Sequence, residues 1–391
     1  MPEIMKVIGL MSGTSLDGVD AALIESDGEA LVRPGPALTL PYDVPTRGLL
    51  RQALEDAPAV ADGAPISHAI REAQRVSTEA HATAVRALLA RAGLSSAQVG
   101  LIGFHGQTIL HRPAGRLTWQ IGDGALLARF TGIDVVNDFR SADVAAGGQG
   151  APLMPLYHAA LARQLARSFS SPVYGGGGPR SGGGGSSTAF TQPVAVVNIG
   201  GVSNVTYIDG DTVLAFDSGP GNAPIDDWMH RHTGRPVDEG GALARQGRVD
   251  EAALKTMLAH PFFDRAPPKS LDRQDFGMEA VEGLSPADGA ATLAAFTAAA
   301  IARAREHFPA TAATWIICGG GRHNDFLMER LRALVGARVC RSEEAGWDGD
   351  ALEAQGFAYL AMRSIKGLPL SLPTTTGVPV PMTGGVLHRA P

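Results

Sequence analysis

The sequence predicts an α/β protein of two domains, each built on a mixed β-sheet. Short apolar runs alternate with amphipathic segments along the chain, which favours a mixed α/β sheet over a sandwich. Two similar glycine-rich hairpins occur far apart in the sequence, which indicates that one architecture is used twice. The length of 391 residues is enough for two separate hydrophobic cores.

The first hairpin lies within residues 7–24, where two β-prone runs flank a turn of glycine and hydroxyl residues. Gly13 and Gly18 carry no Cβ and allow a bound group to approach the backbone. Such a turn suits phosphate oxygens, and an ordinary tight turn explains it about as well when it is taken alone. It is not a Walker loop, because no Gly-Lys-Ser/Thr follows.

Residues 25–140 continue the alternation with a third strand near Leu38 and helices over 45–57 and 65–92. Three apolar strands follow, within 101–108, 119–124 and 134–140, and each ends in glycine or polar residues. Open α/β sheets place their ligands at such strand ends.

The second half contains the second hairpin within 194–210, a helix over 284–308, and a strand that ends in Gly319–Gly321 before the helix 325–334. Three glycines in this position allow a flat ring to lie against bare backbone. A last helix is expected over 349–365, followed by an extended tail. Residues 170–190 are rich in Gly, Ser and Pro, which is typical of a flexible linker or surface loop.

Composition narrows the class of protein. A net charge of −6 and a pI near 6.0 argue against a nucleic-acid surface. The longest apolar stretch, 290–302, is too short to span a bilayer, and the first residues lack a signal-peptide pattern. Cys318 and Cys340 form no metal motif or disulfide framework, and Cys318 is expected to be buried. We therefore expect a cytoplasmic protein without a nucleic-acid or membrane partner.

Several longer strings resemble one family. The two hairpins and the triple-glycine loop resemble the superfamily of actin, the heat-shock chaperones and sugar kinases, and the strings go further, to the anhydro-N-acetylmuramic acid kinase family. These strings occur in family order over nearly the whole chain, at residues 9–20, 104–108, 137–140, 143–152, 198–201 and 216–222.

The resemblance implies a fold, a reaction and cofactors. The fold is a two-domain, actin-like (ribonuclease H-like) sugar kinase with an interdomain cleft, divided into 1–140 plus 366–391 and 141–365. The family uses ATP and water to convert 1,6-anhydro-N-acetylmuramic acid into N-acetylmuramic acid 6-phosphate in cell-wall recycling. Its members resemble one another in needing Mg²⁺ and forming homodimers. Relatives in the superfamily usually carry a metal-associated aspartate where this chain has Leu10, so the metal ligands stay unknown.

The reaction needs a base for the attacking water, and two carboxylates are candidates. Asp217 directly precedes a Ser-Gly-Pro-Gly turn at a strand end, where it acts either as the general base or as a cap of the turn. Glu353 lies on the final helix, in a string that also matches the family, and is either a contact to the substrate or part of a solvated face.

The remaining assignments follow the family strings. Arg140 is suited to a carboxylate of the sugar, with a structural salt bridge as the alternative, and His105 is either a sugar contact or a buried histidine. The expected sugar contacts are His105, Gln107, Gln120, Asn137, Asp138 and Arg140. The expected ATP contacts are Ser12, Gly13, Thr14, Ser15, Asp17, Gly18, Asn198, Gly200, Gly201, Gly319, Gly320, Gly321 and Asn324.

Two alternative functions stay open. Another sugar or carboxylate kinase of the same superfamily needs the hairpins but not the strings at 137–140 and 216–222. A non-catalytic, sugar-sensing ATP-binding protein predicts an appended helix-turn-helix or a damaged acid, and the sequence contains neither.

Overall fold

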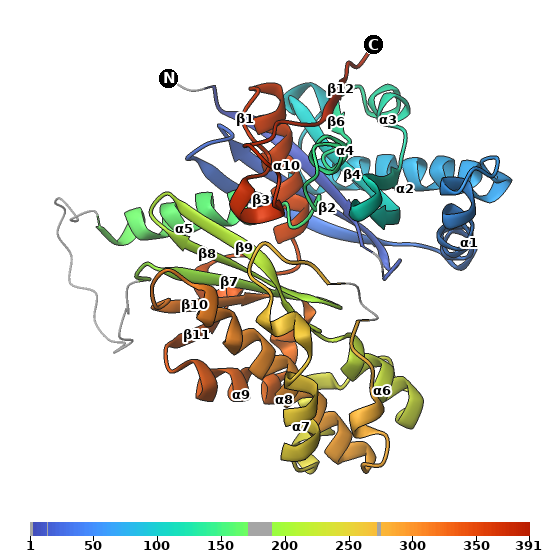
Figure 1. Cartoon of the computed structure of the whole chain (residues 1–391). Helices are drawn as coiled ribbons and strands as arrows, with labels where there is room; N and C mark the ends of the chain where they lie inside the picture. The colour runs from blue at the N-terminus through green and yellow to red at the C-terminus, as the bar shows by residue number, and fades with distance from the viewer. Residues whose placement is uncertain (1–2, 14, 171–189, 272–274) are drawn as a thin grey trace. The chain divides into compact units, whose positions relative to one another are not determined.

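The computed structural model describes residues 3–13, 15–170, 190–271 and 275–391 (Figure 1). The chain forms two compact units. The first unit comprises residues 1–160, 267–270 and 348–391, and the second comprises 161–266 and 271–347. The expected Gly/Ser loop at 170–190 lies almost entirely outside the described residues, and so does Thr14.

The first unit is built on one mixed sheet with strand order β12-β6-β4-β1-β2-β3, to which β5 is added against β4. Strands β1, β4 and β6 run parallel, whereas β2, β3, β5 and β12 pair antiparallel with their neighbours. The strands are β1 (Met5–Ser12), β2 (Gly18–Ser26), β3 (Val32–Pro41), β4 (Leu101–Arg112), β5 (Leu117–Ile121), β6 (Val135–Asn137) and β12 (Val386–His388). The helices are α1 (Val44–Ala61), α2 (His68–Ala92), α3 (Gly124–Thr131), α4 (Ser141–Ala145), α10 (Leu352–Ile365) and α11 (Pro373–Thr376).

The second unit is built on a sheet of order β11-β10-β7-β8-β9. Its strands are β7 (Val194–Ile199), β8 (Ser203–Asp209), β9 (Thr212–Gly219), β10 (Thr314–Cys318) and β11 (Arg338–Arg341). Its helices are α6 (Ala223–Thr233), α7 (Glu251–Leu258), α8 (Pro286–Arg303) and α9 (Asp325–Val335), and α5 (Pro155–Ser170) links the two units along the chain.

The two sheets share one pattern. In each, a meander of three antiparallel strands is extended by two parallel strands on the side of its first strand: β4 and β6 in one unit, β10 and β11 in the other. The predicted α/β class and the duplication of a mixed sheet are therefore confirmed.

Helix α10 packs directly on the first sheet, and two glycines allow it to come close. A Cβ on Gly9 of β1 would lie 1.7 Å from the carbonyl oxygen of Ala354, and one on Gly103 of β4 would lie 2.1 Å from that of Phe357. Only glycine leaves room for this contact, and α10 belongs with the rest of residues 348–391 to the first unit. The expected division, with 141–365 in the second domain, differs from these units here.

The opposite face of the first sheet is covered by α1 and α2. Ile8 and Leu10 alternate with Gly9 along β1 and pack in a core with Ile70 and Val85 of α2. Gly93 ends α2 in the left-handed conformation, with φ of 65°, as its place in the sequence predicts.

The core of the second unit surrounds the alanine-rich helix α8. A Cβ on Gly219 at the end of β9 would lie 2.6 Å from the Cβ of Ala300, so strand and helix pack tightly there. Cys318 is buried, as predicted. Within the described residues, no helix combines the length and the apolar character needed to cross a membrane.

Candidate active site

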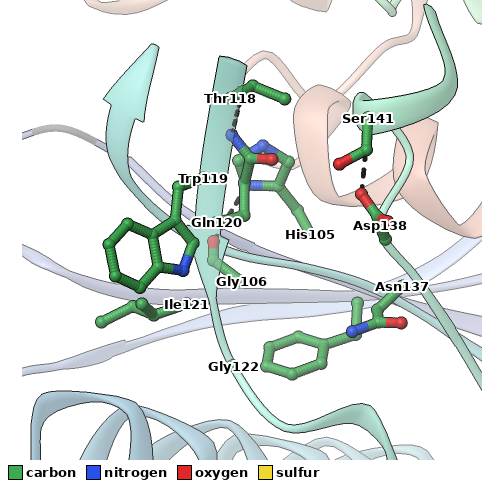
Figure 2. Close-up of a pocket in the computed structure, with 11 residues that line it drawn as sticks. His105, Gly106, Thr118, Trp119, Gln120, Ile121, Gly122, Asn137, Asp138 and Ser141 are labelled. Atoms are coloured by element: carbon green, nitrogen blue, oxygen red, sulfur yellow. Dashed lines mark hydrogen bonds between the residues drawn. The ribbon is translucent and has the colours of Figure 1, made fainter. Parts of the chain in front are cut away.

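A polar pocket of about 250 Å³ lies at the strand ends of the first unit (Figure 2). Its walls come from the bend in β4, from β5 and from the segment that follows β6. Of the expected sugar contacts, four line it: His105, Gln120, Asn137 and Asp138. Phe104, Gly106, Thr118, Trp119, Ile121, Gly122 and Ser141 complete the lining. Gln107 and Arg140 are not part of this lining.

The orientation of the Gln120 amide is fixed by two threonines. Its Nε2 donates to Thr118 Oγ1 at 2.8 Å and to Thr108 Oγ1 at 3.2 Å. Both amide hydrogens are therefore committed, and no described residue donates to Oε1. Gln120 offers the pocket a hydrogen-bond acceptor.

Asn137 and Asp138 lie at the end of β6, where the backbone turns sharply. Asp138 has φ of 56°, a left-handed conformation that Asp tolerates better than most residues. Its Oδ1 accepts from the backbone N–H of Ser141 at 3.4 Å, as Figure 2 shows. The Oδ1 of Asn137 pairs with Nε2 of His388 at 2.9 Å.

Both ring nitrogens of His105 are engaged inside the protein. Nδ1 pairs with the carbonyl oxygen of Gly106 at 2.9 Å, and Nε2 accepts from Nε of Arg140 at 3.0 Å. Burial, followed by the charge of Arg140, holds the pKa of His105 well below its usual value. The histidine is therefore neutral, carries its proton on Nδ1, and supports Arg140 while its ring lines the pocket.

Arg140 is held behind the pocket wall. Its Nη1 donates to the carbonyl oxygen of Gly150 at 2.7 Å. Burial lowers the pKa of Arg140 to about 10, while the carboxylates of Glu353 and Asp143 act in the opposite direction. Glu353, at the start of α10, is partly buried and close enough to Arg140 to raise the pKa of its guanidinium within the first unit.

The first hairpin is anchored by a buried hydroxyl network. Ser12 Oγ donates to Oε1 of Gln107 at 2.6 Å and accepts from the Tyr42 hydroxyl at 2.9 Å. The side chains of Ser12 and Gln107 therefore hold the turn in place. Of these two residues, only backbone atoms are left for the predicted contacts with a ligand. Ser15 and Asp17 are exposed in the turn, and a Cβ on Gly13 would meet only Ser15 Oγ, at 3.7 Å.

The second hairpin turn lies against two other loops of its unit. The backbone N–H of Asn222 donates to the carbonyl oxygen of Gly200 at 2.7 Å, and its side chain donates to that of Ile199 at 3.2 Å. A Cβ on Gly319, where φ is 74°, would lie 2.2 Å from Oδ1 of Asn198. The structure thus gathers five of the expected ATP contacts, Asn198, Gly200, Gly201, Gly319 and Gly321, around the end of β7.

The outer sides of this cluster are open. Gly201 and Gly320 are exposed, and a Cβ on either would have its nearest neighbour at 3.8 Å or more. Arg322 is buried below the loop, where it donates to the carbonyl oxygen of Gly319 at 3.0 Å and pairs with Glu343 at 2.8 Å. Asn324 caps α9 through the backbone N–H of Leu327, so its buried side chain serves the helix.

Asp217 lies near the end of β9, opposite Asn204 of β8. Its Oδ2 accepts from the backbone N–H of Leu271 at 2.8 Å. Burial raises the pKa of Asp217 to about 7, and the hydrogen bond from Leu271 only partly offsets this. A carboxylate with a pKa near neutrality is well matched to general acid-base chemistry.

Among the residues that the structure describes, no group of three or more His, Cys, Asp or Glu side chains is placed to bind a metal ion. Leu10, where relatives in the superfamily have an aspartate, is fully buried in the first core. The described residues therefore do not fit a metal ion bound by protein side chains alone.

Sequence reasoning missed Thr118, Tyr42, Asn222 and Arg322. Thr118 shares a strand face with Gln120 because it lies two residues away, so strand periodicity could have found it. Asn222 stands directly before α6, inside a string that the sequence had already marked. Tyr42 and Arg322 act through partners distant in sequence, and no local pattern reveals them.

The chain is similar to known proteins over nearly its whole length. The family model described as anhydro-N-acetylmuramic acid kinase matches residues 5–176 and 187–390. A Rhodospirillum rubrum protein named anhydro-N-acetylmuramic acid kinase is 52% identical over 387 residues, covering 98% of this chain and 94% of that protein. A protein of the same name from Nitrobacter winogradskyi is also 52% identical and covers 98% of this chain and 100% of that protein. The chain therefore belongs to the anhydro-N-acetylmuramic acid kinase family.

Proposed function

We propose that this protein is an ATP-dependent kinase that opens the 1,6-anhydro ring of 1,6-anhydro-N-acetylmuramic acid with water and phosphorylates O6. The products are N-acetylmuramic acid 6-phosphate and ADP. The observation that carries the proposal is the 52% identity to relatives of that name over 98% of the chain. The polar pocket and the carboxylate with a pKa near 7 support it from the geometry.

In the proposed reaction, Asp217 accepts a proton from water as the water oxygen attacks the anomeric carbon. The bond between that carbon and the bridging oxygen breaks, and the bridging oxygen takes the γ-phosphoryl group from ATP. A base with a pKa near 7 is half deprotonated at neutral pH and still basic enough to accept the proton. The bond between the γ-phosphorus and the β,γ-bridging oxygen of ATP breaks, ADP leaves, and Asp217 then releases its proton to solvent, so no further reactant is needed.

The sugar is proposed to occupy the pocket of the first unit. Gln120 accepts from a donor of the sugar, and Asp138 accepts from a hydroxyl group. His105 and Arg140 support this wall, and the Arg140 guanidinium adds positive charge for the lactyl carboxylate. Glu353 acts on the site through Arg140.

The glycine turns are proposed to hold the nucleotide. Backbone N–H groups of the two hairpin turns, among them those of Ser15 and Gly201, bind phosphate oxygens, and Gly319–Gly321 contacts the adenosine. The N–H groups of Leu16 and Gly200 already donate to the carbonyl oxygens of Gly13 and Val202. Mg²⁺ would neutralise phosphate charge in this reaction, with ATP phosphates and water as ligands. We also propose that the protein is a homodimer and lies in the cytoplasm. Its mass in solution tests whether it is a dimer.

The test is ADP release after adding 1,6-anhydro-N-acetylmuramic acid to the protein with ATP and Mg²⁺. Release that depends on this sugar, with no release for N-acetylglucosamine or N-acetylmuramic acid, is expected. Equal release with either control sugar would favour a conventional sugar kinase. ADP release without any sugar would indicate an ATPase.

A further inference from the structure

The C-terminal segment places a side chain against the pocket of the first unit. Strand β12 pairs antiparallel with β6, with Leu387 opposite Val136 and His388 opposite Val135. Residues 135 and 137 share one face of β6 because side chains alternate along a strand. His388 therefore reaches diagonally to Asn137, and its Nε2 lies 2.9 Å from Oδ1 of the amide.

This hydrogen bond determines which end of the Asn137 amide is left for a ligand. An amide oxygen accepts and an amide nitrogen donates, so the contact requires Nε2 of His388 to carry the proton. With Oδ1 committed, Nδ2 keeps two donors, and no described residue accepts from it. Figure 2 shows the nitrogen of Asn137 turned toward the other lining residues and its oxygen turned away.

A third element leaves room for this pair. Gly124 is the first residue of α3, two residues after Gly122 of the pocket wall. A Cβ on Gly124 would lie 2.6 Å from Cδ2 of His388, 2.9 Å from its Nε2 and 3.1 Å from Cγ of Asn137. The histidine and the amide thus fill the space that the glycine leaves open, and α3, β6 and β12 meet at this point.

The tail does not depend on His388 for its own attachment. The Asp134 carboxylate accepts from Nη1 of Arg389 at 2.5 Å and from the backbone N–H of Ala390 at 2.8 Å. Upstream, Ser364 Oγ donates to the carbonyl oxygen of Gly384 at 2.5 Å. Removing the imidazole therefore leaves the segment in place.

We propose that His388 is a positioning residue that holds Asn137 as a hydrogen-bond donor toward an acceptor oxygen of the sugar. The pocket then presents a matched pair: Gln120 as acceptor, oriented by its threonines, and Asn137 as donor, oriented by His388. This inference rests on the proposed function for the identity of the sugar. His388 itself makes no contact with substrate.

The test compares His388→Leu, which removes the donor, with His388→Gln, whose amide nitrogen can replace Nε2. We expect His388→Leu to raise KM for the anhydrosugar about 5- to 10-fold, the effect of losing one oriented hydrogen bond. KM for ATP should not change, and His388→Gln should restore most of the affinity. In an Asn137→Ala background, His388→Leu should add nothing, because the two residues act as one unit.

Gly124→Ala is a second route to the same result, because its new methyl group displaces the pair without removing either side chain. It should raise KM for the sugar, whereas Gly48→Ala, in open space on α1, should have no effect. An unchanged sugar KM in both His388→Leu and Gly124→Ala overturns the inference, and so does full additivity with Asn137→Ala. If the wild-type protein releases no ADP with the sugar, the proposed function fails, and the role of His388 falls with it.

Discussion

The two units share a strand order but use the ends of their strands differently. In the first, the end of β1 is fixed by the Tyr42–Ser12–Gln107 network, and the neighbouring strand ends form a polar pocket. In the second, the end of β7 is surrounded by glycine loops, and a carboxylate with a raised pKa stands on β9. The comparison shows that one strand pattern occurs in both units and that different side chains stand at its strand ends. We propose that the first unit binds the sugar and that the second supplies the general base.

The largest expected effect comes from removing the base of the second unit. Asp217→Asn keeps the shape of the side chain and its contact with the N–H of Leu271 but cannot accept a proton. We expect kcat to fall about 10²- to 10⁴-fold, with ATP affinity unchanged. ADP release and nucleotide binding measure the two quantities. Retained turnover would place the base elsewhere, with Glu353 as the next candidate.

The pH dependence of kcat is a second test of Asp217 as the general base. Burial raises the pKa of Asp217 to about 7, and a general base works only when it is deprotonated. The value of kcat should therefore rise with pH up to about 7 and be level above it, falling about 100-fold by pH 5. The residual rate of Asp217→Asn should be flat over this range. A plateau that extends down to pH 5 in the wild type would contradict this assignment.

A smaller effect tests the glycine loops. In Gly319→Ala, the new Cβ would lie 2.2 Å from Oδ1 of Asn198. We expect KM for ATP to rise about tenfold, with the sugar KM little changed. Gly234→Ala is the matched control, because its φ of 71° carries the same backbone strain but nothing lies within 4 Å. Equal effects of the two variants on KM for ATP would show that strain alone, and not the loop, is responsible.

The smallest effect concerns the hydroxyl network of the first hairpin. Tyr42→Phe removes the donor to Ser12, which should lower the free energy of unfolding by about 1 kcal/mol. It should also raise KM for ATP a few fold, because the hairpin turn loses an anchor. Tyr157→Phe, which removes a buried bond to Gln355, should have a similar effect on thermal stability and none on KM. An equal KM for ATP in the two variants would show that the hydroxyl network of the first hairpin does not contribute to ATP binding.

Local patterns predicted most of the fold. The helices at 45–57 and 65–92 appear as α1 and α2, because caps and apolar spacing are local signals. The sequence did not reveal that α10 belongs to the first unit, since that follows from glycines on distant strands that leave room for the helix.

In the candidate site, too, local features were predicted and contacts between distant residues were not. Strand-end residues such as Gln120 and Asn137 were predicted, whereas their partners Thr118 and His388 were not. Thr118 lies on the same strand as Gln120 and follows from strand periodicity, but His388 pairs with Asn137 across strands, and that pairing depends on register.

The measurement that tests the account most directly is the position of oxygen from solvent in the product. The reaction is run in ¹⁸O-labelled water with ATP and 1,6-anhydro-N-acetylmuramic acid, and the product is fragmented by mass spectrometry. We expect the label on the anomeric oxygen and unlabelled phosphate, because water attacks the sugar while the bridging oxygen takes the phosphoryl group. Label in the phosphate, with none on the sugar, would mean that water attacks ATP and would contradict the account.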